Sequence, residues 1–165
     1  MPVNPLLVSA YTATSCLGRG LSATVDALQA GRSGLQPCAF ETVDLATWIG
    51  EVPAVDAQKL PESLSRYDCR NNRLTLMGLE TDGFGDRVRE AVARYGKTRV
   101  GVFLGTSTAG ILQTEQAYRR RDPATGALPE DFIYRTTHNS FSLAEFTRDY
   151  FGLEGMAMAI STACS

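Results

Sequence analysis

The sequence predicts an α/β fold, a layered arrangement in which helices cover a sheet on both faces. Segments with helical periodicity alternate along the chain with short apolar runs. These runs are continuous, as in strands buried on both faces, and do not alternate apolar with polar residues. With 165 residues, of which 44% are hydrophobic and 21% charged, the chain can bury a core. Since no linker divides it, we expect one domain.

Four short apolar runs predict strands. In chain order they are Leu6–Ala10, Trp48–Val52, Val100–Leu104 and Met156–Ile160. Val100–Leu104 is the clearest, because its mostly β-favouring residues stop at Gly105. Leu6–Ala10 and Met156–Ile160 are expected to be buried. Residues 32–64 carry three prolines and are otherwise expected to be irregular.

Helical periodicity predicts the segments between these strands. In chain order they cover residues 21–31, 70–94, 111–121 and 142–151. The first is expected to end near Gly31, a residue common just past a helix C-terminus. The second contains three glycines, each costing about 1 kcal/mol relative to Ala, so it is one kinked helix or two. Ser142 and Glu145 have capping-box spacing, so Ser142 should start the last helix, which ends at Gly152.

Composition and charge argue against several classes of function. The formal net charge is −2, and the densest basic stretch, Arg119–Arg121, is answered by Asp122. This pattern favours a solvated helix end over a nucleic-acid patch. The chain shows no signal peptide and no apolar stretch of membrane-spanning length. Its four cysteines contain no CxxC pair, so neither a disulfide framework nor a zinc site is predicted. We expect a cytoplasmic protein without a metal, a nucleic-acid partner or a membrane insertion.

Cys164 is the main candidate for chemistry. It follows a predicted strand and would sit in the first turn of a helix, where unpaired N–H groups and the helix dipole stabilise a thiolate. The same N–H groups can stabilise the oxyanion formed when a thioester carbonyl is attacked. Small neighbours would let such a carbonyl come close. Since a lone cysteine among apolar residues is more often structural, its position alone leaves that role open.

Two further features favour structural roles. The small-residue turn Gly105–Gly110 resembles a nucleophile elbow only loosely, so close packing is favoured over catalysis by Ser107. His138 is the single histidine and has no carboxylate motif at triad spacing. A structural or surface role is its default. The remaining cysteines are expected to be buried small hydrophobes: Cys16, Cys38 and Cys69.

Four stretches, in order, resemble the β-ketoacyl-carrier-protein synthases, the condensing enzymes of the thiolase-like superfamily. Gly155–Ser165 is similar to their active-site segment, in which T-A-C-S or T-A-C-A surrounds the acylated cysteine. Leu6–Gly20 resembles their first strand and glycine loop. Leu28–Gly34 resembles their A-L-x-x-G-x-S-G segment, and Arg99–Gly110 resembles their R-x-G-x-x-x-G-T/S strand and turn. One such motif is weak, whereas four in order ending at the cysteine are specific.

The resemblance implies a thiolase-like α-β-α-β-α fold, with residues 1–165 as mainly its N-terminal half, and a dimer. It also implies a decarboxylative Claisen condensation. An acyl chain would pass from the phosphopantetheine of an acyl-carrier protein to Cys164, and malonyl-carrier protein would lose CO₂ and attack it. No cofactor of the enzyme's own is implied. The family's two decarboxylation histidines and supporting lysine follow the cysteine, so the 165-residue piece alone is expected to be inactive and not to fold stably.

Residue by residue, the resemblance makes Cys164 the nucleophile and its backbone N–H one oxyanion donor. Thr108 falls at the position that lines the far end of the acyl pocket. Thr137, His138 and Asn139 fall near the segment that walls this pocket at the dimer interface. His138 precedes the cysteine and matches neither decarboxylation histidine.

Several readings stay open at this point. The first is a condensing enzyme of fatty-acid or of polyene and polyketide biosynthesis, working as a homodimer or in a ketosynthase heterodimer. The second is a non-catalytic partner subunit of the chain-length-factor kind, against which Cys164 counts, because such partners usually replace the nucleophile. The third is a thiolase-like acyltransferase that uses free coenzyme A thioesters. A binding module with an unreactive Cys164 is the remaining alternative.

Overall fold

The computed structural model describes residues 5–40 and 43–162 of the chain, which forms two compact units. The first unit comprises Met1–Pro53 and Gly78–Arg87, and the second Ala54–Met77 and Val88–Ser165. The chain thus leaves the first unit and enters it again. Because the first unit is discontinuous in sequence, no single linker marks the boundary between the two units.

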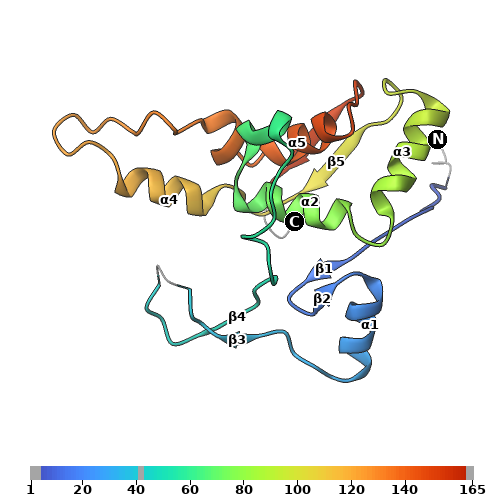
Figure 1. Ribbon diagram of the computed structural model, residues 1–165, viewed down its shortest axis with the longest axis horizontal. Helices are drawn as coiled ribbons and strands as arrows, with labels where there is room; N and C mark the ends of the chain where they lie inside the picture. Colours follow the sequence, from blue (N-terminus) through green and yellow to red (C-terminus); the bar gives the residue numbers. More distant parts are fainter. Residues whose placement is uncertain (1–4, 41–42, 163–165) are drawn as a thin grey trace. The chain divides into compact units, whose positions relative to one another are not determined.

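Among its described residues, the first unit contains two pairs of antiparallel strands and one complete helix (Figure 1). β1 (Thr14–Ser15) pairs with β2 (Gly18–Arg19), and β3 (Gln36–Pro37) pairs with β4 (Trp48–Ile49). Helix α1 (Leu21–Gln29) follows β2 directly. Ala27 is its buried residue, while Val25 and Leu28 of the apolar stripe are exposed.

Asp82 connects the parts of the first unit. One oxygen of its carboxylate, Oδ2, accepts hydrogen bonds from Thr12 Oγ1 at 2.8 Å and from the backbone N–H of Leu21 at 2.9 Å. The Leu21 N–H belongs to the first turn of α1, whose N-cap is a glycine without a side-chain cap. A carboxylate from a distant segment therefore caps this helix and meets the positive end of its dipole.

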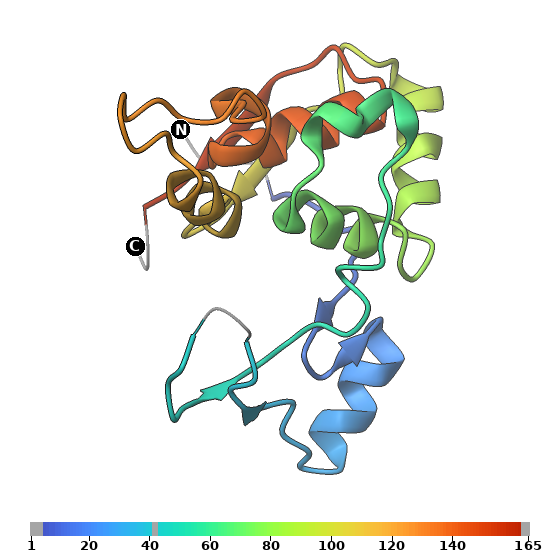
Figure 2. The same ribbon diagram turned by 60° about the vertical axis from the view of Figure 1, so that its left-hand side comes forward.

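The second unit is built on a parallel pair of strands (Figures 1 and 2). β5 (Val102–Gly105) and β6 (Ala157–Ile160) are joined through α4 (Ile111–Arg119), the π-helical turn η2 (Tyr134–His138) and α5 (Ser142–Tyr150). The elements before β5 are η1 (Glu62–Tyr67), α2 (Arg70–Leu79) and α3 (Phe84–Tyr95), and the last two contribute residues to both units. A parallel pair with helices between its strands confirms the predicted α/β class.

Helix α5 is buried on two sides. On one side α5 packs on both β5 and β6, and on the other side it packs on η1 and η2. Phe146 is 0% exposed and meets the Tyr67 ring edge-on, with 5.8 Å between the ring centroids. The cluster on the sheet consists of Val102, Ala144, Leu153 and Ala159, and the cluster towards η1 and α2 consists of Leu64, Tyr67, Leu76 and Phe146.

The strand predictions are confirmed in the second unit and only in part elsewhere. β5 and β6 lie within two residues of the predicted runs, and the predicted Trp48–Val52 strand is limited to Trp48–Ile49. The buried strand predicted at Leu6–Ala10 is wrong. Within the described residues this segment forms no strand, and the Leu6 side chain is 94% exposed. An apolar run forms a strand only where a neighbour completes its hydrogen-bond ladder, and local sequence does not reveal that neighbour.

The β5–β6 pair also departs from the expected burial. Val102 and Ala159 on one face are buried against helices. On the other face Phe103, Met158 and Ile160 are exposed in the described chain. Since the side chains of a strand alternate between its two faces, a continuous apolar run says nothing about which face is covered.

The helix predictions are confirmed in position. α1, α4 and α5 end within two residues of their predicted ends, and the segment 70–94 consists of two helices. The break between them contains Asp82 and Gly83, with φ of 55° and 70°, in the left-handed region that a helix does not use.

The capping box predicted at Ser142 is wrong. Phe141 is the N-cap of α5, no side chain caps the helix, and Ser142 is its buried first residue. Glu145 pairs with Arg135 of η2 instead, with 2.9 Å between Oε1 and the guanidinium. Glu145 therefore binds a residue of a neighbouring element, and it does not make the local capping contact that the sequence predicted.

The Asp149 carboxylate links α5 to η1. Tyr67 Oη donates to its Oδ2 at 2.7 Å, Arg66 donates to the same oxygen at 2.8 Å, and Arg148 donates to Oδ1 at 3.0 Å. Burial alone would raise the pKa of Asp149, but the hydrogen bonds from Tyr67, Arg148 and Arg66 together outweigh it and lower this pKa below its usual value. The charged form is therefore the one that stabilises the fold.

Replacing Phe146 by Ala should lower the free energy of unfolding by about 3–5 kcal/mol, because it leaves a cavity between α5, η1 and α2. Urea denaturation of the intact protein measures the change. Phe141→Ala is the matched control, since this ring is 55% exposed. Equal losses for the two variants would contradict the two-sided burial of α5.

The Asp149→Asn substitution should destabilise the protein by about 1–3 kcal/mol at neutral pH. Because the folded-state pKa is lowered, this contribution exists above the unfolded pKa near 3.8 and disappears as the pH falls through the folded value. Denaturation curves of both proteins should therefore converge in acid. Asp131→Asn, which removes an exposed pair with Arg120, should cost less than about 1 kcal/mol. A loss for Asp149→Asn that is independent of pH would count against the carboxylate network.

Candidate functional site

The candidate site lies at the carboxyl ends of β5 and β6. These strands are parallel, with Gly105 opposite Ile160, so both segments leave the sheet at the same edge. The loop Thr106–Gly110 follows β5 there, and Ser161 and Thr162 follow β6. In sheets of this kind, ligands are bound at the carboxyl ends of the strands.

Cys164, the predicted nucleophile, lies outside the described residues, two positions after Thr162. The segment that leads to it is tied to the loop after β5. Ser161 Oγ donates a hydrogen bond to the carbonyl of Ser107 at 2.9 Å. Ser161, three residues before Cys164 in the sequence, is therefore held beside the loop that carries Thr108.

The loop Thr106–Gly110 is shaped by its own hydrogen bonds. The Thr106 N–H donates to the Ile160 carbonyl at 3.0 Å and extends the β5–β6 pairing by one residue. Thr106 Oγ1 donates to the Thr108 carbonyl at 2.9 Å. Ala109 is buried and Thr108 is exposed. The loop thus exposes Thr108, while the neighbouring Ala109 is packed inside.

Gly110 ends this loop in close contact with Thr137 and His138. A Cβ at Gly110 would lie 2.5 Å from the Thr137 carbonyl oxygen and 2.7 Å from His138 Cα, and φ is 70°. Its N–H donates to Asn71 Oδ1 at 3.0 Å. The close packing predicted for this motif is confirmed, and the contact joins the loop of Thr108 to the predicted pocket segment 137–139.

His138 is held by a chain of hydrogen bonds. Thr114 Oγ1 donates to the Gly110 carbonyl at 2.7 Å, so it accepts from His138 Nδ1 at 3.1 Å, and Nδ1 carries the proton. The Phe132 ring covers the imidazole, with 4.1 Å between the centroids. Burial lowers the pKa of His138 and so favours the neutral ring, while the charge of Asp131 opposes this shift. These contacts support the structural role predicted for this residue.

Thr137 and Asn139 make bonds within their own segment. Thr137 Oγ1 donates to the Ile133 carbonyl at 3.0 Å, and Asn139 Oδ1 accepts the Phe141 N–H at 3.0 Å. The first bond lies within η2, and the second shapes the turn between η2 and α5. The side chains therefore help to hold the segment in shape.

A polar pocket of about 300 Å³ is lined by Thr137 and His138, among others. Its two guanidinium groups are paired, Arg120 with Asp131 at 2.9 Å and Arg66 with Asp149 at 2.8 Å. The pocket therefore offers hydrogen-bonding groups without an uncompensated positive charge.

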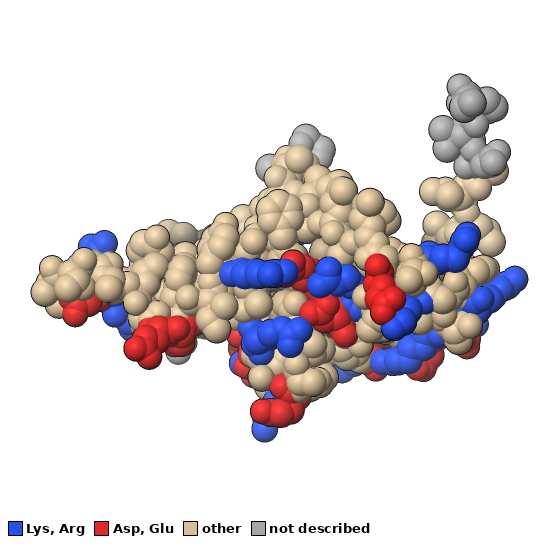
Figure 3. Space-filling view, turned by 90° about the horizontal axis from the view of Figure 1, so that it is seen from above, with Lys and Arg blue, Asp and Glu red and all other residues tan. Residues whose placement is uncertain are grey.

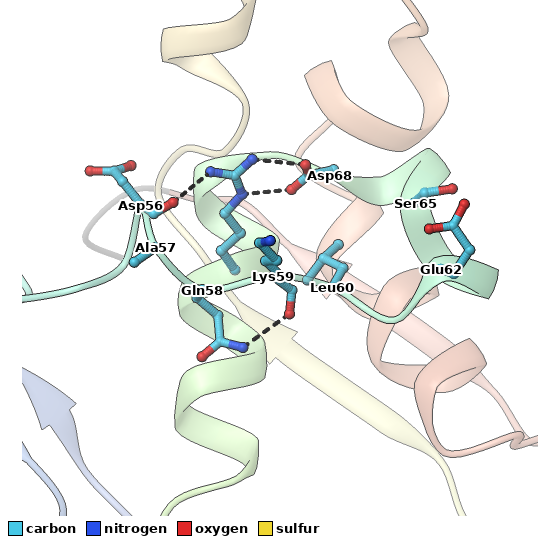
Figure 4. Close-up of a pocket in the computed structure, with 9 residues that line it drawn as sticks. Asp56, Ala57, Gln58, Lys59, Leu60, Glu62, Ser65 and Asp68 are labelled. Atoms are coloured by element: carbon cyan, nitrogen blue, oxygen red, sulfur yellow. Dashed lines mark hydrogen bonds and ion pairs between the residues drawn. The ribbon is translucent and has the colours of Figure 1, made fainter.

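A second pocket, of about 360 Å³, lies between η1 and the start of α2 (Figure 4). Arg73 crosses it and donates to both oxygens of Asp68, at 2.6 and 2.7 Å, and to the Asp56 carbonyl at 3.1 Å. Because the guanidinium of Arg73 and the carboxylate of Asp68 are already bonded to each other, we assign no chemistry to this pocket. Asn71, Thr114 and Ser161 are the site residues that sequence reasoning missed, because their roles depend on contacts between distant segments.

The described cysteines differ in burial. Cys69 is 1% exposed, and burial raises the pKa of its thiol. It therefore behaves as the small hydrophobe that was predicted. Cys16 and Cys38 are only half-buried, so the prediction holds for them in part.

On the face drawn in Figure 3, Lys and Arg side chains are interleaved with Asp and Glu. Among residues 5–40 and 43–162, no group of three or more His, Cys, Asp or Glu side chains could hold a metal ion. The helices of this same part of the chain are too short or too polar to cross a bilayer.

The fold is similar to that of a chain in the solved complex of a ketosynthase (ApeO) with its chain length factor (ApeC) from Xenorhabdus doucetiae. The TM-score is 0.66 at 25% sequence identity, and the match covers 94% of this chain and 38% of that chain. No family model and no curated protein matches the sequence. The chain therefore has a ketosynthase-like α/β fold and spans well under half the length of that neighbour. The α-β-α-β-α layering stays a prediction.

The Gly110→Ala substitution should lower the free energy of unfolding by about 2 kcal/mol more than Gly126→Ala. Both glycines have positive φ, 70° and 74°, but a Cβ at Gly126 meets nothing within 4 Å, whereas one at Gly110 meets backbone atoms of Thr137 and His138. Urea denaturation of the two variants measures the difference. Equal losses would mean that the loop and the segment 137–139 are not in close contact.

Proposed function

We propose that the protein is a ketosynthase that carries an acyl chain as a thioester on Cys164. One combination of observations supports this proposal above all. The fold is ketosynthase-like, and Cys164 follows β6 by four residues in a T-A-C-S context. Ser161, three residues earlier, is hydrogen-bonded to the loop of Thr108. The nucleophile would thus stand at the edge where the parallel strands end.

The first half-reaction is an acyl transfer. The Cys164 thiolate attacks the thioester carbonyl of an acyl-carrier protein, forming a new carbon–sulfur bond and a tetrahedral oxyanion. The backbone N–H of Cys164 would donate to this oxyanion. The intermediate collapses by expelling the carrier's phosphopantetheine thiolate, which then takes up a proton.

The second half-reaction forms the carbon–carbon bond. Malonyl-carrier protein loses CO₂, and the electron pair of the broken bond becomes a carbanion that attacks the acyl-enzyme carbonyl. The Cys164 thiolate leaves, and the β-ketoacyl product remains on the carrier. The resemblance to the condensing enzymes implies that two histidines and a lysine promote the decarboxylation. His138 is not assigned to it, because its Nδ1 is bonded to Thr114 and Phe132 covers its ring.

The acyl pocket of this proposal is lined by Thr108 and by the segment from Thr137 to Asn139. Gly110 supports the grouping, because it brings the loop and the segment into contact. The acyl substrates belong to fatty-acid or to polyene and polyketide biosynthesis. An acyl-carrier protein and a second ketosynthase-type subunit, identical or different, are the proposed partners.

A second candidate is a non-catalytic partner subunit. The solved complex contains a chain length factor as well as a ketosynthase, and the fold is compatible with either role. Cys164 favours the catalytic role, since a partner that only shapes the pocket has no need of a nucleophile.

Incubating the full protein that contains this chain with an acyl-carrier thioester should add the mass of one acyl group, located on Cys164 by peptide mapping. Cys164→Ala should abolish the adduct, because it removes the proposed nucleophile. Cys38→Ala is the control and should keep it, since Cys38 lies in the other unit.

The alternatives predict other results in the same assay. A protein that is never acylated, yet restores condensation by a separate ketosynthase, would be a partner subunit. Acylation by free acyl coenzyme A but not by the carrier thioester would indicate the coenzyme A-dependent class.

A further inference from the structure

We infer that Asn71 is a positioning residue that fixes the loop of Thr108 and thereby sets which acyl chain lengths the site accepts. This inference rests on the proposed function, since it concerns the acyl group on Cys164. Asn71 lies on α2, 39 residues before Gly110 in the sequence, and reaches the loop through one hydrogen bond.

The Gly110 peptide groups are held from two directions. The N–H donates to Asn71 Oδ1 at 3.0 Å, and the carbonyl accepts from Thr114 Oγ1 at 2.7 Å. Thr114 is in turn held by His138. Gly110 is buried, so removal of the Asn71 acceptor would leave its N–H without a partner and without access to water.

The other end of the loop is anchored as well. The Thr106 N–H is bonded to Ile160, and Ser107 accepts from Ser161. Between these anchors and Gly110 only Thr108 and Ala109 remain, and Ala109 is buried. The position of Thr108 therefore follows from where Asn71 holds Gly110.

The loop is also bonded to the segment that leads to Cys164 in the sequence. Ser161, which bonds the loop, is three residues before Cys164. An acyl chain on that thiol that runs along the sheet edge would meet the loop next. Since a packed interior accommodates even one methylene group poorly, a loosened loop changes which chain length fits.

Three variants of the full protein test the loop itself. Asn71→Leu removes the acceptor at similar size, Asn71→Asp keeps an acceptor oxygen, and Thr75→Ala removes a hydrogen bond to the Asn71 carbonyl that does not reach the loop. Amide hydrogen exchange of the peptide covering residues 106–113 should be roughly 3- to 10-fold faster in Asn71→Leu, as expected for one lost hydrogen bond. Asn71→Asp should restore slow exchange, and Thr75→Ala should leave it unchanged.

The same variants are then compared in the acylation of Cys164 by carrier thioesters of increasing acyl length. In Asn71→Leu the ratio of kcat/KM between long and short chains should change by roughly 3- to 10-fold. In Asn71→Asp and Thr75→Ala it should stay near that of the wild type. A purely structural role would lower all rates together and leave the ratio unchanged.

Two results would overturn the inference while leaving the proposed function intact. One is exchange in Asn71→Leu no faster than in Thr75→Ala. The other is faster exchange with an unchanged length ratio. Absence of any acylation of the wild-type protein is a different failure, because it removes the proposed function and the inference that rests on it.

Discussion

Burial of helix α5 between the strands and the η1–α2 segment is the interaction on which the second unit depends. Phe146 fills the space on one side and Ala144 lies on the sheet on the other. Parallel strands need a long crossover, and β5 and β6 pair residues as far apart in sequence as Val102 and Ala157. Because α5 leads directly into β6 and contacts both strands, its burial offsets the entropy lost in closing this long loop.

The same helix decides the geometry of the candidate site. Its first turn follows the segment Thr137–Asn139, and its last turn leads to β6 and on to Ser161. Once α5 is packed, the segment Thr137–Asn139 and Ser161 both lie beside the loop that follows β5. The close packing of Gly110 against Thr137 and His138, and the hydrogen bond from Ser161 to the Ser107 carbonyl, then join them to that loop. The packing of α5 in the core therefore positions the segments of the site, and the polar contacts between these segments then fix their local geometry.

Much of the second unit is predictable from sequence, because its elements carry their own signals. Periodicity placed α4 and α5, and β-favouring runs placed β5 and β6. The failures share one cause. Leu6–Ala10 has strand composition, but it has no strand partner among the described residues. Ser142 and Glu145 have capping-box spacing, but the Glu145 carboxylate pairs with Arg135. Local patterns predict what a segment favours, and a distant partner can override it.

By itself the sequence determined the α/β class, the order of the main helices and strands, and the T-A-C-S context of Cys164. These are properties of neighbouring residues, so a linear pattern contains them. Only the tertiary structure decided that Asn71 accepts a hydrogen bond from the Gly110 N–H and that Gly110 packs against His138. It also decided that one face of the β5–β6 pair is exposed in the described chain. Such contacts join residues that are far apart along the chain, and their free energy exists only after the helices have packed.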